Sequence, residues 1–405
     1  MVLSYIHAHK DDDVRSLAFT KMPEGVNRTW ALQQIEGYQL AKKKLPQWAS
    51  LFAEGNDLHF PPRLSMEQCS SEATARCKGS IIQRLVGDNT CSLTDLTGGY
   101  GIDFSYMARH VGRSVYVERN EELCNIARHN FSLLGLSNAE VINADCENYL
   151  TQLSDNNNAP FTSPTIIFLD PARRDSAGGK VFAIEDCTPN LVMLQDSLLN
   201  IADTVMVKLS PMLDITQALR TLRNVSDVHI VSVKGECREL LFIMHKEEPT
   251  SLTYHCVNLE TEEEIFQHDV TSEFRHNDMP VCRYAEPGNI LFEPNASIMK
   301  AGVQDAFGNR YGLRKLHPNS NLYIGDAPID LVPARQFRIV AVSDFSKKGL
   351  KNLLGDIEQA NLTVRNFPST TDALRRKLKI KEGGSVYLFA TTLHDGSHVL
   401  IRCSK

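Results

Sequence analysis

The chain has 405 residues, with 43 Lys and Arg against 49 Asp and Glu and a formal net charge of −6. Its 42% apolar and 23% charged residues are ordinary for a folded protein and exclude a disordered or a fibrous one. The length predicts two to four domains, and the overall acidity argues against nucleic-acid binding, which usually depends on a basic surface.

The ten cysteines form no C-x-x-C pair, and no histidine pair stands at zinc spacing. The sequence therefore predicts free thiols in a reducing compartment and no metal site. The start, MVLSYIHAHKDDD, is not typical of a signal peptide, and no apolar run approaches the roughly 18 residues of a membrane span. We expect a cytoplasmic protein with no membrane partner.

Residues 1–85 have apolar positions three and four apart in segments such as NRTWALQQIEGYQLAKKKL, which predicts an N-terminal helical domain. Ser65 and Ser70 are predicted to cap helices of this domain. Pro61 and Pro62 cannot lie inside a helix, so the loop GNDLHFPPRL is expected to separate two helical segments.

From about residue 90, short apolar runs alternate with helical stretches. The runs are CSLTDL, SVYVE, AEVINA, PTIIFLD, DTVMVKL, VHIVSV and ELLFIM. Such alternation predicts a mostly parallel sheet covered on both faces, over residues 86–250. The last two runs are joined by only KGECR, which favours an antiparallel hairpin. The predicted fold class is therefore α/β, with a seven-stranded Rossmann-like sheet that ends in a reversed strand.

After residue 250 the pattern changes to α+β. Residues 251–333 mix strands with one expected helix near NASIMKAGVQDAFG. Residues 334–405 follow the order strand–helix–strand–helix–strand–strand. We expect two C-terminal modules with these boundaries.

The segment DLTGGYGID, residues 95–103, follows the first predicted strand and precedes a helix. Gly98, Gly99 and Gly101 allow the backbone to turn tightly and to approach a ligand closely. Asp95, at the strand end, can accept a hydrogen bond from an ammonium group.

Acidic residues also end the next two strands. Glu118 ends SVYVE, where a carboxylate can accept hydrogen bonds from two ribose hydroxyls, and Asp145 ends VINAD, where it can take an adenine amino group. A nicotinamide-dinucleotide domain would instead require G-x-G-x-x-G around a pyrophosphate. The acid before the glycines would repel a pyrophosphate, but it suits the positively charged arm of S-adenosylmethionine.

DLTGGYGID, the acid of VYVE, the acid of INAD and LDPARR together resemble the class I S-adenosylmethionine-dependent methyltransferases. The resemblance covers about residues 65–250 and implies S-adenosylmethionine as the cofactor. The residues that it implies for cofactor binding are Asp95, Thr97, Gly98, Gly99, Gly101, Asp103, Glu118, Asp145 and Asp170.

The whole chain is similar to a bacterial group in which this domain is followed by a ferredoxin-like module and a THUMP-like domain. SMEQCSSEATARCKG and FEPNASIMKAG carry that similarity. THUMP domains in general are RNA-binding units of tRNA-modifying enzymes, so the resemblance implies RNA as a partner. Residues 335–405 hold 13 basic and 6 acidic side chains, so the acidity belongs to the middle of the chain and does not exclude RNA.

Asp170, Pro171, Ala172, Arg173 and Arg174 follow the fourth strand, whose end faces the transferred methyl group in this family. Asp170 is the expected contact of the substrate nucleophile. Pro171 and the two arginines are expected to bind substrate, with the arginines pairing with phosphates or a carboxylate. The alternative is that Arg173 and Arg174 are solvated charges of a loop and do not bind substrate. Ala172 and Arg173 depart from the [DNS]-P-P-[YFW] motif of amino-methylating members, and LDPARRDSAGG lacks the cysteine that C5 methylation requires.

Ribose 2′-O-methyltransferases of this fold use a Lys-Asp-Lys-Glu tetrad. The matching positions here are Lys78, Asp170, Lys208 and Glu239. A lysine can take the proton of a poorly acidic hydroxyl, and carboxylates can position it. Charged residues are also common at strand ends, so scattered ion pairs remain the alternative.

We therefore predict a methyltransferase that acts on RNA, either tRNA or rRNA, with the THUMP-like domain helping to bind it. One alternative is a methyltransferase for a protein or a small molecule. Another is a non-catalytic RNA-binding protein with a methyltransferase-like core, against which the intact Asp95, glycine segment and Glu118 argue.

Overall fold

The computed structural model describes residues 2–87, 90–155, 164–172, 184–260, 263–270, 280–282, 284–355 and 357–405. Contacts within the chain divide it into two compact units. The first unit comprises Met1–Val228 and Leu240–Thr250, and the second comprises His229–Glu239 and Ser251–Lys405. Each unit has a hydrophobic core of its own.

Within residues 2–87 the chain is helical, as predicted. The helices are α1 (Val2–His9), α2 (Val14–Ala18), α3 (Arg28–Lys44), α4 (Pro46–Ala53), α5 (Arg63–Gln68) and α6 (Glu72–Val86). Their apolar faces share one core, in which Trp48 and Phe60 are fully buried. This core also takes in Tyr100 and Ile102, so the helices cover the segment that follows the first strand.

The two predicted helix caps are wrong. Helix α5 begins directly after Pro62, which places Ser65 inside the helix. Ser71, not Ser70, caps α6, because its side chain accepts a hydrogen bond from the amide of Thr74. The hydroxyl of Ser70 is therefore available for another role.

Seven strands match the predicted apolar runs: β1 (Ser92–Asp95), β2 (Arg113–Glu118), β3 (Ala139–Asn143), β4 (Thr165–Leu169), β5 (Thr204–Leu209), β6 (Val225–Val233) and β7 (Glu236–His245). Their order is β3-β2-β1-β4-β5-β7-β6. Strands β1 to β5 are parallel, whereas β7 runs antiparallel to β5 with Leu241 opposite Lys208. The predicted reversal is confirmed.

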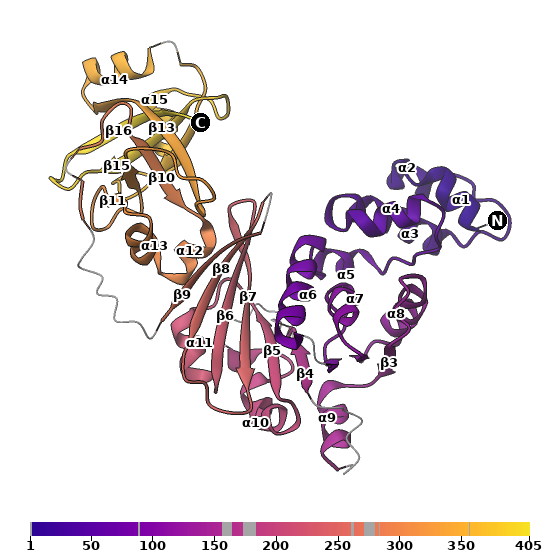
Figure 1. The fold of residues 1–405 in the computed structure, drawn as a ribbon. Coiled ribbons are helices and arrows are strands. Elements are labelled where there is room, and N and C mark those ends of the chain that lie inside the picture. Colours follow the sequence, from indigo (N-terminus) through magenta and orange to yellow (C-terminus); the bar gives the residue numbers. More distant parts are fainter. Residues whose placement is uncertain are drawn as a thin grey trace. The chain divides into compact units, whose positions relative to one another are not determined.

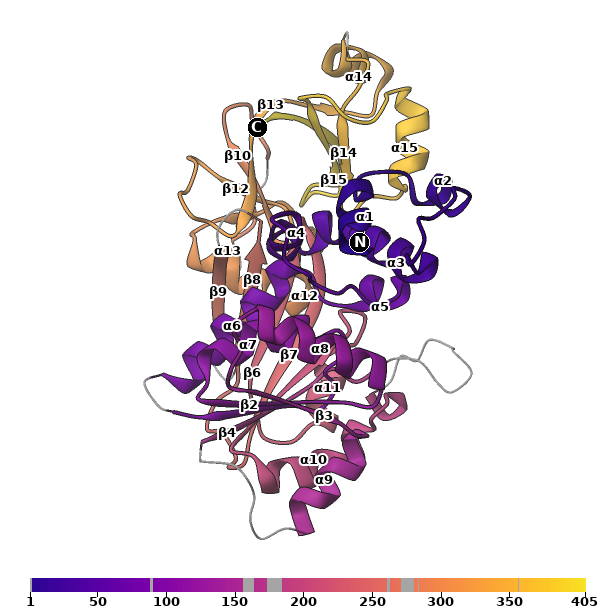
Figure 2. The same ribbon diagram turned by 90° about the vertical axis from the view of Figure 1, so that its right-hand side faces the viewer.

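Helices connect the parallel strands: α7 (Ile102–Met107), η1 (Ala108–His110), α8 (Glu121–Leu133), α9 (Cys146–Asp155), η2 (Ile184–Asp186), α10 (Leu191–Ile201) and α11 (Ile215–Thr221). In Figure 2, α6, α7 and α8 lie on one side of these strands, and α9 and α10 lie on the other. Helices α1 to α5 pack on the α6–α8 side in Figures 1 and 2. In the described ranges, none of the helices has the length and apolar character to cross a bilayer.

The second unit contains the hairpin of β8 (Thr253–Leu259) and β9 (Glu263–Asp269). The tip of the β6–β7 hairpin belongs to this unit, where the Ser232 hydroxyl donates to the Val257 carbonyl at 3.1 Å. Strands β8 and β9 extend the order of the large sheet to nine. The sequence predicted seven strands in this sheet, which is two too few. The segments that form β8 and β9 were expected to belong to the following module, residues 251–333.

The other elements of the second unit are β10 (Ile290–Pro294), α12 (Ala296–Ala301), α13 (Gln304–Arg310), β11 (Arg314–Lys315), β12 (Tyr323–Gly325), β13 (Ala334–Asp344), α14 (Lys347–Leu354), β14 (Asn361–Val364), α15 (Thr371–Leu378), β15 (Tyr387–Thr392) and β16 (His398–Ser404). The element order predicted for residues 334–405 is confirmed. The prediction of a single helix near residue 300 is wrong, because two helices lie there. Gly302, with a φ of +73°, ends α12, and α13 starts two residues later.

These elements build a second sheet with the strand order β11-β12-β10-β13-β16-β15-β14. Strands β10 and β13 pair directly, so the two predicted C-terminal modules share one continuous sheet. Glu293 of β10 also forms ion pairs with Arg335 and Arg365, which belong to the following predicted module, residues 334–405. Helices α14 and α15 pack against one face of this sheet through Leu353 and Leu374.

Candidate active site

The glycine segment forms a tight turn between β1 and α7. Gly99 and Gly101 have φ values of +55° and +81°, in the left-handed region that favours glycine. A Cβ atom on Gly98 would lie 2.1 Å from the Tyr116 ring, and one on Gly101 would lie 2.7 Å from the Phe131 ring. Packing and backbone conformation therefore account for all three glycines.

Glu118, at the end of β2, holds this turn through both of its carboxylate oxygens. Oε2 accepts a hydrogen bond from the Gly99 amide and Oε1 accepts one from the Asn120 amide, both at 2.9 Å. The Tyr116 hydroxyl donates to the carbonyl of Gly99. Glu118, which is predicted to bind the ribose of the cofactor, thus also holds the backbone of Gly99 and Asn120 in place.

Asp95 is a buried carboxylate at the end of β1. Its Oδ1 accepts a hydrogen bond from the Thr97 amide at 2.9 Å. Burial raises the pKa of Asp95 well above its usual value, and the nearby Asp103, Asp170 and Glu118 add to this effect against the opposing Thr97 hydrogen bond. A cation beside Asp95 would favour the charged carboxylate, so this position suits a positively charged ligand group.

Thr97 joins the glycine turn to the end of β4. Its hydroxyl oxygen accepts a hydrogen bond from the amide of Asp170 at 2.7 Å. Strands β1 and β4 are adjacent and parallel, so their carboxyl ends meet at one edge of the sheet. The residues Asp95, Thr97 and Asp170, all predicted to bind the cofactor, are therefore neighbours.

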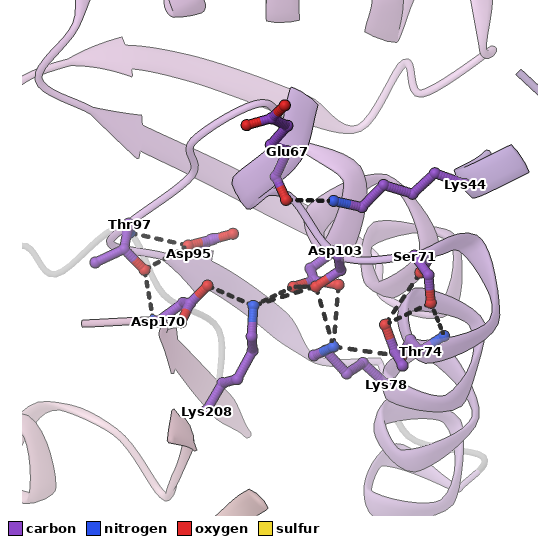
Figure 3. A network of polar contacts seen from close by, with 11 residues as sticks. Lys44, Glu67, Ser71, Thr74, Lys78, Asp95, Thr97, Asp103, Asp170 and Lys208 are labelled. Atoms are coloured by element: carbon purple, nitrogen blue, oxygen red, sulfur yellow. Dashed lines mark hydrogen bonds and ion pairs between the residues drawn. The ribbon is translucent and has the colours of Figure 1, made fainter. Parts of the chain in front are cut away.

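Four charged side chains form a network beside this turn (Figure 3). Lys208 Nζ lies 2.5 Å from Asp170 Oδ2 and 3.5 Å from Asp103 Oδ2. Lys78 Nζ lies 3.1 Å from Asp103 Oδ1. Three of the four predicted catalytic residues are thus brought together, and Asp103 bridges their two lysines.

Ser70 completes the network, a role that was not predicted from the sequence. Its hydroxyl donates to Asp103 Oδ2 at 2.7 Å and accepts from Lys208 Nζ at 3.1 Å and from Lys78 Nζ at 3.4 Å. A serine hydroxyl has one donor and two acceptor positions, and all three are used here. Ser70 and Lys208 are 138 residues apart, so no local pattern could connect them.

The network runs from the core to the surface. The side chain of Lys78 is 0% exposed, those of Asp103 and Lys208 are 11% and 15% exposed, and that of Asp170 is 38% exposed. Burial by itself would raise the pKa of Asp103, but Lys78, Lys208 and Ser70 together hold that pKa below its usual value. Asp103 is therefore negatively charged although it is buried. Asp170 is the most exposed residue of the charged network.

The other predicted residues lie at the margin of this site. Asp145 is exposed at the start of α9, where Oδ1 accepts a hydrogen bond from the Glu147 amide at 2.9 Å. Pro171 is buried and directly follows Asp170. Arg173 and Arg174 lie outside the described residues.

Glu239, the fourth residue of the predicted tetrad, is a buried carboxylate in β7. Leu241, two residues further along β7, pairs with Lys208 of β5. Side chains two residues apart on a strand share a face. Glu239 belongs to the second unit, and its part in the tetrad stays a prediction.

Family models match two adjoining parts of the second unit. Residues 334–405 match the THUMP domain-like family, and residues 291–333 match a ferredoxin-like domain. The boundary between the two matches falls at the start of β13, within the continuous sheet.

Known proteins resemble the chain over most or all of its length. A crystal structure from Porphyromonas gingivalis W83, assigned to the methyltransferases, is 32% identical with a TM-score of 0.83, and the match covers 100% of this chain and 97% of that one. An uncharacterized S-adenosylmethionine-dependent methyltransferase of Mycobacterium tuberculosis is 25% identical over 337 residues, which is 82% of this chain and 84% of the relative. The similarity thus extends through both units.

Proposed function

The chain belongs to the S-adenosylmethionine-dependent methyltransferases, in a group with ferredoxin-like and THUMP-like modules after the catalytic domain, and we propose that it methylates RNA. The observation that carries this proposal is the presence, in one chain, of a methyltransferase site and a basic THUMP-like module. Because the resemblance to THUMP domains implies RNA binding, tRNA or rRNA is the proposed substrate class.

The glycine turn fits S-adenosylmethionine, whose sulfonium supplies an already activated methyl group. Gly99 has no side chain, and a Cβ atom there would meet no side-chain atom within 4 Å, so a ligand can approach the backbone closely at this position. We assign the cofactor's ammonium group to Asp95, its ribose hydroxyls to Glu118 and its adenine amino group to Asp145. A carboxylate has about four acceptor positions, so Glu118 keeps capacity beyond its two amide partners.

We assign the contact with the substrate nucleophile to Asp170, because it is the exposed end of the charged network. Methyl transfer requires alignment of the nucleophile and an acceptor for its departing proton. In this proposal the Asp170 carboxylate takes the proton, and the Lys208 ammonium group orients that carboxylate. Asp103 and Lys78, which are more deeply buried, hold Lys208 in position.

The THUMP-like module supports the RNA proposal through its surface charge. Helices α14 and α15 bury Leu353 and Leu374 and expose basic side chains on their outer faces. The exposed basic residues on these helices and just after α15 are Lys347, Lys348, Lys351, Arg376, Lys377, Lys379 and Lys381. Clustered lysines and arginines of this kind bind phosphate groups.

The deciding experiment compares methylated nucleosides in RNA from cells with and without the gene, by mass spectrometry. We expect at least one methylated nucleoside to disappear in the deletion strain. The wild-type gene should restore it, whereas a gene carrying Lys208→Ala should not. The mass and retention of the missing nucleoside then identify the methylated atom.

If every RNA class keeps its methylation, the substrate is a protein or a small molecule. Salt dependence gives a second readout, because the logarithm of RNA affinity should fall with the logarithm of salt concentration by about 0.7 for each single-strand phosphate contact. Replacing Lys347 and Lys348 together by Ala should reduce this slope. A cytoplasmic location is part of the proposal, and the ten free cysteines fit a reducing compartment.

A further inference from the structure

A second group of polar side chains lies apart from the charged network, where the loop before α5 meets α8. Among the described residues, one set of three potential metal ligands brings its donor atoms within 4.8 Å of one another. The set consists of Asp57 and His59 from the loop and His129 from α8. We propose that these three side chains bind one Zn²⁺ ion, a site independent of the methyltransferase assignment.

The spacing of the donor atoms suits a tetrahedral ion. Asp57 Oδ1 lies 3.4 Å from His59 Nε2, and Asp57 Oδ2 lies 3.7 Å from His129 Nε2. Around zinc, with metal–ligand distances of about 2.0–2.2 Å, neighbouring ligand atoms are about 3.3–3.5 Å apart. The separations between Asp57 and the two imidazoles are therefore close to those around a zinc ion.

The backbone that carries these ligands is already held in place. Asn130, a fully buried neighbour of His129, accepts a hydrogen bond from the His59 amide at 2.9 Å and donates one to the His59 carbonyl at 2.8 Å. The Tyr100 hydroxyl donates to the same carbonyl at 3.0 Å. These three hydrogen bonds involve neither imidazole, so they would still hold the loop to α8 when the His129 ring changes its partner.

Both imidazoles border an open cavity of about 700 Å³. Its other lining residues are Trp30, Glu121, Glu122, Asn125 and Ile126. The two glutamates add negative charge close to the proposed ion, and the open space admits water as the fourth ligand. Asp57 Oδ1 is buried and lies 3.4 Å from His59 Nε2, so both atoms can turn toward one ion.

Binding requires a defined rearrangement of the rings. The imidazoles of His59 and His129 are stacked, with centroids 3.8 Å apart and planes 12° apart. His129 Nε2 lies 2.5 Å from the Asp57 carbonyl oxygen, to which it donates. On binding, the His129 ring turns toward the cavity and carries its proton on Nδ1, so that Nε2 can bind the ion. Two imidazoles and one carboxylate favour Zn²⁺ over Mg²⁺ or Ca²⁺, which prefer oxygen ligands.

The test uses the full-length chain without an affinity tag, first treated with a chelator and then titrated with Co²⁺ as a spectroscopic probe. We expect one Co²⁺ per chain, with visible absorption bands that Zn²⁺ removes by competition. His59→Ala and His129→Ala should each weaken the binding by more than about 100-fold. Asp57→Asn should also weaken it. His394→Ala, which changes an exposed histidine outside this cluster, should bind as the wild type does.

A second measurement covers the case in which a variant folds poorly. Zn²⁺ should raise the melting temperature of the wild type and of His394→Ala, because an ion that binds only the folded state stabilises it. It should leave the melting temperature of His129→Ala unchanged. Failure of the wild type to retain one ion per chain would overturn the proposal, and so would binding that survives the loss of either histidine.

Discussion

Lys208 Nζ lies 2.5 Å from Asp170 Oδ2, and the two residues come from the carboxyl ends of the neighbouring parallel strands β5 and β4. Asp170 is the more exposed of the pair, so the lysine supports the carboxylate from the side of the core. In the proposed function, this carboxylate, oriented by the Lys208 cation, is the group that contacts the substrate.

Replacing Lys208 with Ala should lower the rate of methyl transfer by about 10²–10⁴-fold, because Asp170, the proposed proton acceptor, loses the cation that orients it. Cofactor affinity should stay close to that of the wild type, since none of the proposed cofactor contacts involves this side chain. Transfer of labelled methyl groups to RNA from cells that lack the gene measures the rate, and calorimetry measures the affinity. Lys234→Ala, in the exposed β6–β7 turn, is the matched control. A Lys208→Ala variant with full activity would exclude the catalytic assignment.

Replacing Asp103 with Asn should destabilise the protein by about 3–5 kcal/mol, because it removes a carboxylate partner from the fully buried Lys78. Adding Lys78→Met to the same chain should recover part of the loss, since the buried charge disappears as well. Urea unfolding at neutral pH gives both values. Equal stability of Asp103→Asn and the wild type would show that the bridge contributes nothing to folding.

The Asp103 carboxyl also links stability to pH. Its pKa in the folded protein is held below the ordinary value of 3.8. The stabilisation is therefore fully present above that ordinary value and is lost as the pH falls through the lower, folded-state pKa. Acid unfolding of the wild type should show this loss, and the Asp103→Asn variant should lack this component of the transition.

Replacing Glu118 with Ala should weaken S-adenosylmethionine binding by about 10–100-fold, because hydrogen bonds to a charged group are lost and the Gly99 amide loses its acceptor. Isothermal titration calorimetry checks this value directly. Glu140→Ala is the control, because Glu140 is an exposed carboxylate of β3 that pairs with Arg113. Equal affinities for the two variants would remove Glu118 from the cofactor site.

Cofactor affinity should rise with pH over part of the range in which the protein stays folded. Burial raises the pKa of Asp95, so at low pH the free protein holds this carboxyl protonated. A cationic ligand group prefers the carboxylate, and affinity should therefore fall as the pH drops below the raised pKa. Calorimetry over the pH range in which the protein stays folded can follow the change. Asp95→Asn should bind weakly at every pH, and a wild type with constant affinity would contradict the assignment.

The periodicity of the chain predicted most of the architecture. Apolar runs of strand length alternate with helices, and KGECR can connect only a hairpin, so the reversed strand β7 followed directly. Gly302 shows the limit of such patterns. ASIMKAGVQDAFG has a helical composition throughout, but the left-handed conformation of this glycine divides it into two helices.

The contacts of the charged network were only partly predictable from the sequence. Lys78, Asp170 and Lys208 were found by matching residue types at expected element ends. Ser70 resembled a helix cap, and the partners of Asp103 lie far away in the sequence, so their contacts depend on how α6 packs against α7 and β5. The proposed zinc site illustrates the same limit, because His59 and His129 are separated by 70 residues in the chain and meet only in three dimensions.

Two polar groups of the charged network, Ser70 and Lys78, come from the helical region that precedes the first strand. A shortened chain that began at β1 would keep the glycine turn and the strand ends, but its Asp103 would face solvent in place of a serine and a lysine. The sheet by itself therefore lacks two of the groups that make up the charged network. Replacing the residues before β1 with those of another protein should therefore break the contacts of Asp103 with Ser70 and Lys78.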